Sequence, residues 1–298
     1  MLTASVWTEP FVWWAVLAGT AIALAAGLVG HVTVLRGQVF AGDALSHVAV
    51  TGSLAALAFG VDLRLGLYGG CVGFALLLAV LGGRQGADDT VIGSVFAWVL
   101  GLGALFLSLY ASNGSGEATG GTAGVSVLFG SLLGLTGQQA VADAAVSLVA
   151  AGVMVVVARP LIFASLDPAV ARAGGVPVRM LSALLFLLLG VIAAVATQAV
   201  GALLLLGLLA APAGAAQRLV ARPFAALWLS AGIAMASVWS GLIVSCLWPS
   251  IPASPAIIVA ATTAYGLAWM ASVRRGGPRT RIASASTGPV ADDLVCPA

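Results

Sequence analysis

The chain has very little charge, with 12 Lys or Arg, 10 Asp or Glu and 2 His among its 298 residues. Charged residues make up 7% of the sequence, whereas soluble domains carry about 25%. Hydrophobic residues make up 61%, and the mean hydropathy is +1.13. These values exclude a soluble globular domain and are typical of a protein that crosses a membrane many times and lies in contact with lipid.

Neither a basic surface nor a cysteine framework is present. The net charge of +2 is small and dispersed between apolar runs, which excludes a nucleic-acid partner. The three cysteines, Cys71, Cys246 and Cys296, are odd in number and show no C-x-x-C spacing. We therefore expect neither disulfides nor a cysteine metal site, and we interpret the cysteines as packing residues.

The chain also lacks the common catalytic motifs. H-E-x-x-H, G-x-S-x-G and G-x-x-x-x-G-K-[ST] are all missing, so the chain cannot hydrolyse ATP by P-loop chemistry and we expect no enzyme activity of its own. We expect no permanently bound cofactor. The first ten residues lack a basic region, and the apolar run after them is long enough to remain in the membrane, so no cleaved signal peptide is predicted.

Long apolar runs separated by short polar turns predict an all-α transmembrane bundle of about nine spans, in a range of eight to ten. The predicted spans are residues 11–35, 42–60, 65–81, 91–110, 140–158, 178–196, 200–219, 224–247 and 256–272. Residues 125–136 are apolar but too short to cross, which predicts a surface or re-entrant helix. Residues 1–273 are thus a transmembrane domain, and the small, polar residues 274–298 are predicted to be a disordered tail.

Arginine placement predicts the orientation in a bacterial plasma membrane, because basic loops stay cytoplasmic. The basic residues that fix the C-terminal tail inside are Arg274, Arg275, Arg279 and Arg281. Counting back also places residues 36, 84, 159–179 and 218–222 inside. The N-terminus then lies outside, although a single re-entrant segment would reverse it.

The segment Gly42-Asp43-Ala44-Leu45-Ser46-His47 places a carboxylate and an imidazole four residues apart in a chain that otherwise avoids charge. In a helix such residues share one face, so Asp43 and His47 could bind the same cation. Ionisable groups at membrane depth usually face a cavity or a partner and mark an ion pathway. The alternative is that Asp43 is the N-cap of the following helix, with His47 a polar residue of its first turn.

A second polar segment, between residues 159 and 179, is too polar to lie in the membrane. It contains Asp167 and Arg172, with Pro168 suited to a first helical turn and Gly174 to a C-terminal cap beside Gly175. We expect a short cytoplasmic helix that carries force from a partner.

Three further residues have predicted roles within the spans. Gly201 is expected to allow close helix packing, and Pro212 to kink its helix, as a hinge or as a static bend. His31 is interpreted as an interfacial histidine held by a hydrogen bond, with a third metal ligand as the alternative.

Five segments, in order, resemble the metal-ion family of ABC transporter permeases, the membrane subunits of bacterial zinc and manganese importers. They are residues 34–52 (VLRGQVFAGDALSHVAVTG), 128–136 (LFGSLLGLT), 166–176 (LDPAVARAGGV), 200–223 (VGALLLLGLLAAPAGAAQRLVARP) and 251–260 (IPASPAIIVA). Together they cover most of residues 25–272.

The resemblance implies a permease that pairs with a second membrane subunit, here a homodimer. It further implies a separate cytoplasmic ATPase that binds ATP and an extracytoplasmic metal-binding lipoprotein. Asp43 and His47 match the positions that meet the transported ion. The segment that docks into the ATPase corresponds to Asp167, Pro168, Ala171, Arg172, Gly174 and Gly175.

One departure concerns the fourth span, where some zinc-importing relatives carry a histidine. Residues 94–98 (SVFAW) contain none, which weakens a choice of zinc over manganese; iron is a further candidate. The alternative function is a stand-alone secondary transporter or channel for a cation. We regard it as less favoured because we expect no second buried carboxylate for a proton relay, with Asp143 placed near the outer membrane face.

Overall fold

The computed structural model describes residues 10–81, 89–112, 130–248 and 251–274, and these residues form helices and connecting turns with no strand among them. The helices are α2 (Pro10–Leu35), α3 (Val39–Ala58), α4 (Leu63–Leu81), α5 (Asp89–Ser112), α7 (Gly137–Leu166), α8 (Pro168–Ala173), α9 (Val178–Ala199), α10 (Ala202–Leu219), α11 (Pro223–Leu247) and α12 (Ala253–Arg274), with the 3-10 turn η1 (Leu132–Gly134). The predicted tail and most of the two longest predicted loops fall outside the described residues.

Eight of the described helices are long and apolar enough to cross a membrane. With α10, which has 18 residues, they make the nine long helices that the sequence predicts. The prediction of an all-α membrane bundle is confirmed. Residues 130–136 of the predicted short helix contain only η1, and the rest of that segment is not described.

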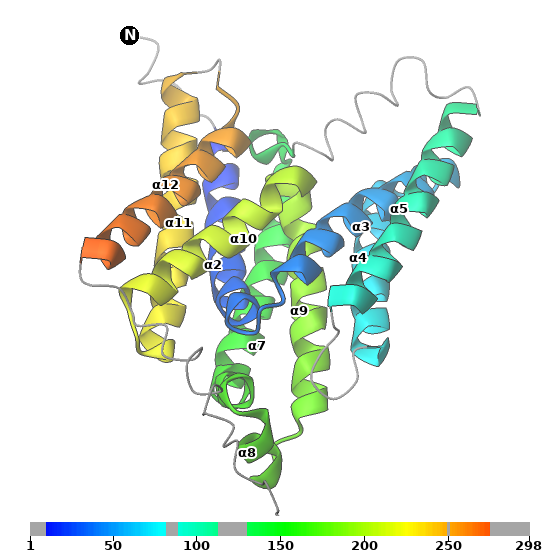
Figure 1. The fold of residues 1–298 in the computed structure, drawn as a ribbon. Helices are drawn as coiled ribbons and strands as arrows, with labels where there is room; N and C mark the ends of the chain where they lie inside the picture. Colours follow the sequence, from blue (N-terminus) through cyan, green and yellow to red (C-terminus); the bar gives the residue numbers. More distant parts are fainter. Residues whose placement is uncertain (1–9, 82–88, 113–129, 249–250, 275–298) are drawn as a thin grey trace, which may run out of the picture.

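Successive long helices reverse direction, so their ends fall into two groups (Figure 1). The beginning of α2 lies at the top of this view and α8 at the bottom. The turn before α11 lies toward the α8 end, and α12 runs back from the top. Arg36 follows α2 and Arg222 precedes α11, whereas Arg218 and Arg274 lie in the last turns of α10 and α12, so all four belong to helix ends of the α8 group.

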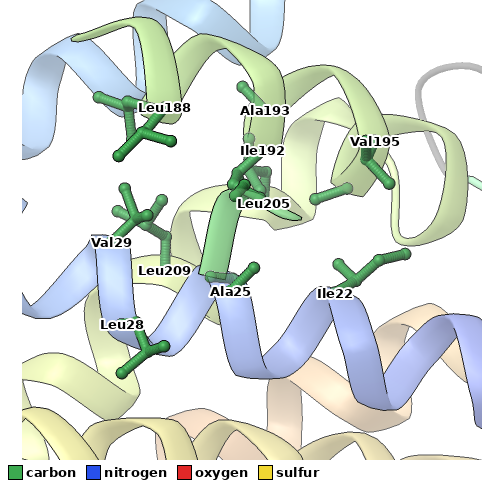
Figure 2. Packing of buried hydrophobic residues seen from close by; sticks show 14 of the residues in the cluster. Ile22, Ala25, Leu28, Val29, Leu188, Ile192, Ala193, Val195, Leu205 and Leu209 are labelled. Atoms are coloured by element: carbon green, nitrogen blue, oxygen red, sulfur yellow. The ribbon is translucent and has the colours of Figure 1, made fainter. Parts of the chain in front are cut away.

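The centre of the bundle is built around α2, which packs on α7, α10 and α11. Figure 2 shows Ile22, Ala25 and Val29 of α2 beside side chains of α9 and α10. The approach is close because small residues line it: a Cβ added at Gly27 would lie 2.6 Å from Ala231 Cα of α11. Small residues at such contacts let helix backbones approach and gain van der Waals packing.

The end of α7 and the position of Gly201 differ from the sequence prediction. α7 does not end at Pro160 but continues through it to Leu166, so its 30 residues span about 45 Å. Buried Leu161 and Ile162 in its last turns outweigh the lost backbone hydrogen bond. Gly201 is not within a span, because it is the N-cap of α10 with φ +101°, a conformation suited to glycine. Pro212 lies inside α10, as predicted.

Candidate metal site

Asp43 and His47 lie on the partly exposed face of α3. Phe40, Asp43, His47 and Val50 are partly or fully exposed along this face, whereas Ala44, Leu45 and Ser46 are buried. The spacing of three and four residues puts the carboxylate and the imidazole on one stripe of the helix. Among the described residues neither side chain forms a hydrogen bond, so both remain available to a ligand.

The alternative role of Asp43 as a helix N-cap is wrong. α3 begins at Val39 with Gln38 as its N-cap, so Asp43 is the fifth residue of the helix. The helix starts early because Gly37 (φ +69°) reverses the chain directly after α2. Ser46 Oγ donates to the carbonyl oxygen of Asp43 at 2.6 Å, not to its carboxylate.

The opposite face of α3 is held tightly against α4. Gly52 faces Gly66, and there is no room for a Cβ on either. Cys71 of α4 is fully buried, and its Sγ donates to Leu45 O at 3.6 Å. Cys71 and Cys246 are both free and buried, so the prediction that they are packing residues is confirmed for these two. This packing fixes which face of α3 stays open.

α5 covers part of the Asp43 face. The Phe96 ring lies 5.5 Å from the His47 ring and 6.0 Å from the Phe40 ring, measured between centroids. Phe96 offers no metal ligand, so α5 supplies an apolar wall at this position. Little of α5 is buried within the chain, and Trp98 on its other side is 64% exposed.

A single chain provides an incomplete metal shell. No group of three or more His, Cys, Asp or Glu side chains converges among the described residues. Zinc sites use four ligands and manganese sites often use six. One carboxylate and one imidazole therefore need further donors, from water or from a second chain.

His31 does not have the environment that the sequence suggests. Its side chain is 1% exposed, and neither ring nitrogen has a hydrogen-bond partner among the described residues. Its carbonyl oxygen accepts a hydrogen bond from Gln217 Nε2 of α10 at 3.1 Å. The predicted interfacial hydrogen bond of the ring is wrong, and His31 does not join Asp43 and His47 in a three-ligand group.

Asp143 corrects a second expectation, because it is a buried carboxylate. It is 1% exposed and accepts a hydrogen bond from Tyr68 OH at 3.3 Å, and its buried Oδ2 has no partner in the part of the chain that the structure describes. The signal in the sequence is the stripe Ala140, Asp143, Ser147, Ala151 and Met154 at helical spacing, all of which are buried in α7. The stripe predicts that this face turns inward.

The predicted cytoplasmic helix is α8, and its local geometry follows from its sequence. Asp167 caps it by accepting from Ala169 N and Val170 N, both at 3.0 Å, and Pro168 begins the helix. Gly174 is the C-cap, and Gly175 takes φ +78°. Ala171, however, is fully buried in the chain. The exposed surface of α8 is instead formed by Ala169, Val170, Arg172 and Ala173.

Comparison with known proteins matches the chain to one family of transport proteins. Residues 8–272 match the model of the ABC 3 transport family. The manganese transport system membrane protein MntC of Halalkalibacterium halodurans is 27% identical over 263 residues, which are 88% of this chain and 87% of that protein. The manganese import system permease protein ScaB of Streptococcus parasanguinis is 30% identical over 203 residues, which are 68% and 70% of the two chains.

A solved structure shares the fold. The structure of PsaBC from Streptococcus pneumoniae in complex with a Fab includes a chain with a TM-score of 0.75 and 23% identity. The similarity covers 90% of this chain and 94% of that one.

Proposed function

Because the chain belongs to the ABC 3 transport family, we propose that it is the permease subunit of an ATP-driven importer for a divalent first-row metal, with Mn²⁺ as the first candidate and Zn²⁺ as the second. The observation that carries this proposal is the open face of α3. Asp43 and His47 share that face, partly exposed, and their side chains form no hydrogen bond in the described part of the chain. The manganese transport named for the similar proteins favours Mn²⁺.

The metal shell is completed by a second copy of the chain. A twofold axis beside α3 would bring together two carboxylates and two imidazoles, a set that binds Mn²⁺ or Zn²⁺ without sharp selection. Loose binding suits a transporter, since the ion must be released on the far side. A separate extracytoplasmic binding protein would then select the metal.

Energy comes from a separate cytoplasmic ATPase that seats on α8. The capped α8 lies at one extreme of the bundle (Figure 1) and exposes Val170, which is 53% accessible. The arginines of this end support a cytoplasmic position for α8 and for the C-terminus, because basic segments tend to stay on the cytoplasmic side.

A secondary transporter is the other candidate, and buried Asp143 is the observation that favours it. A buried carboxylate with one oxygen unpaired among the described residues could carry a proton. Asp143, however, lies on α7 against Tyr68 of α4, and not on the face that holds Asp43 and His47.

The test is metal uptake into proteoliposomes that contain the permease with its ATPase. We expect Mn²⁺ uptake that requires ATP, and we expect Asp43→Asn and His47→Ala each to lower it at least tenfold while assembly with the ATPase is kept. Asp62→Asn is the matched control, because Asp62 is an exposed carboxylate in the turn after α3. ATP-independent uptake by the permease alone would support the secondary transporter.

A further inference from the structure

Arg36 links the turn between α2 and α3 to the two helices that flank α8. Its Nε donates to Ser165 Oγ in the last turn of α7 at 2.7 Å. Its Nη1 donates to Ser182 Oγ near the start of α9 at 2.8 Å. One side chain therefore joins three segments that are far apart in the sequence.

The two serines are oriented to accept these hydrogen bonds. Ser165 Oγ donates its proton to Leu161 O, and Ser182 Oγ donates to Val178 O at 3.0 Å. A hydroxyl has one proton, so the remaining lone pairs face Arg36. A planar guanidinium with diverging donors can serve two such acceptors at once, which the single ammonium of lysine does less well.

The Arg36 hydrogen bonds lie beside the first residue of α8. Arg36 and its two serines line a cavity of about 260 Å³ together with Pro168, the first residue of α8. α8 itself packs mainly on α7 and α9. A displacement of α8 therefore reaches α3 through groups that join these helices to the α2–α3 turn.

The turn between α2 and α3, which we call the joint, is short and held by backbone hydrogen bonds. Gly37 N and Gln38 N donate to the carbonyl oxygens of Val34 and Thr33 at 3.1 and 2.9 Å, which closes the end of α2. α3 starts at the next residue, and Asp43 lies only about 7 Å along its axis from Gln38. A tilt of α3 by about 15° at this joint would move Asp43 by roughly 2 Å.

The polar network at the joint is incomplete in this conformation. Arg36 Nη2 and Gln38 Oε1 are buried and have no hydrogen-bond partner among the described residues. Burial lowers the pKa of the Arg36 guanidinium, which nevertheless keeps its charge at neutral pH. Unpaired buried groups are costly, so any rearrangement of these segments that pairs the two atoms would recover free energy.

We propose that Arg36 is the positioning residue that transmits movement of α8 to α3, and thereby shifts Asp43 and His47 when the ATPase acts. This inference rests on the proposed function. The proposal predicts that Arg36 is needed to couple ATP hydrolysis to metal transport, and that it is not needed to bind the metal.

The test uses the complete permease with its ATPase in proteoliposomes and measures Mn²⁺ uptake, ATP hydrolysis and Mn²⁺ binding. We expect Arg36→Met to lower Mn²⁺ transported per ATP hydrolysed at least tenfold, with Mn²⁺ binding and melting temperature near those of the original protein. Arg36→Lys should transport more Mn²⁺ per ATP hydrolysed than Arg36→Met, but less than the original protein. Arg222→Met is the control, because Arg222 is an exposed arginine at the same end of the bundle.

Two results would overturn the proposal. One is an unchanged ratio of Mn²⁺ transported to ATP hydrolysed in Arg36→Met. The other is that Arg36→Met both loses Mn²⁺ binding and melts at a lower temperature, which would mean that Arg36 only stabilises the fold. If Arg36→Met does not fold, the Ser165→Ala/Ser182→Ala double variant, which keeps the arginine, gives the same comparison. Absence of ATP-dependent uptake in the original complex would instead refute the proposed function.

Discussion

Replacing Phe96 with histidine should turn the open face of α3 into a tighter zinc site. The Phe96 and His47 rings are 5.5 Å apart between centroids. Because zinc–nitrogen bonds are about 2.0–2.1 Å long, two imidazoles on one tetrahedral ion have centroids roughly 5 to 6 Å apart. An imidazole at position 96 would therefore be close enough to bind the ion held by His47.

The expected gain in Zn²⁺ affinity is roughly tenfold to hundredfold, equivalent to about 1.4 to 2.8 kcal/mol. Mn²⁺ should gain less, since added nitrogen ligands favour zinc. Tighter binding should also slow release, so Mn²⁺ uptake in the presence of Zn²⁺ should fall in Phe96→His.

Isothermal titration of the purified permease with each metal measures the change in affinity. Trp98→His is the matched control, because Trp98 is 64% exposed on the other side of α5. Phe96→Leu separates loss of the aromatic ring from gain of a ligand. Equal Zn²⁺ affinities in Phe96→His and Trp98→His would refute the placement of the ion beside His47.

Three further predictions follow from the packing. Asp143→Asn keeps an acceptor for Tyr68 OH, so ATP-dependent Mn²⁺ uptake should stay within about twofold; loss of uptake with retained assembly would favour proton coupling. Gly27→Ala places a Cβ 2.6 Å from Ala231 Cα, so it should destabilise the folded protein by about 1–3 kcal/mol and lower its melting temperature in detergent. Gly152→Ala is the control, because no atom lies within 4 Å of the new Cβ, and it should leave the melting temperature unchanged. Val170→Glu on the exposed face of α8 should abolish copurification with the ATPase and leave Mn²⁺ binding unchanged, and intact copurification would move the docking surface.

The features that sequence predicts well are those set by nearby residues. The shared face of Asp43 and His47 follows from a four-residue spacing within one helix, and α8 follows from its own cap residues, Asp167 and Pro168. The nine long helices follow from the length of each apolar run. These features need no knowledge of what packs against them.

Features that depend on distant contacts were predicted less well. The start of α3 gives no capping signal, since Gln38 makes no side-chain cap hydrogen bond. Asp143 is buried and accepts a hydrogen bond from Tyr68, 75 residues away, and the turns of α7 beyond Pro160 bury Leu161 and Ile162 against the bundle. The Arg36 contacts join residues 129 and 146 positions apart, which no local pattern reveals.

Pulsed electron paramagnetic resonance of Mn²⁺ bound to the purified permease can detect whether the transported metal binds Asp43 and His47. Coupling of the manganese electrons to an imidazole nitrogen should be present in the original protein and in His31→Ala. It should disappear in His47→Ala. Nitrogen coupling that persists in His47→Ala and disappears in His31→Ala would show that the ion does not bind at Asp43 and His47 and lies instead inside the bundle, beside α2.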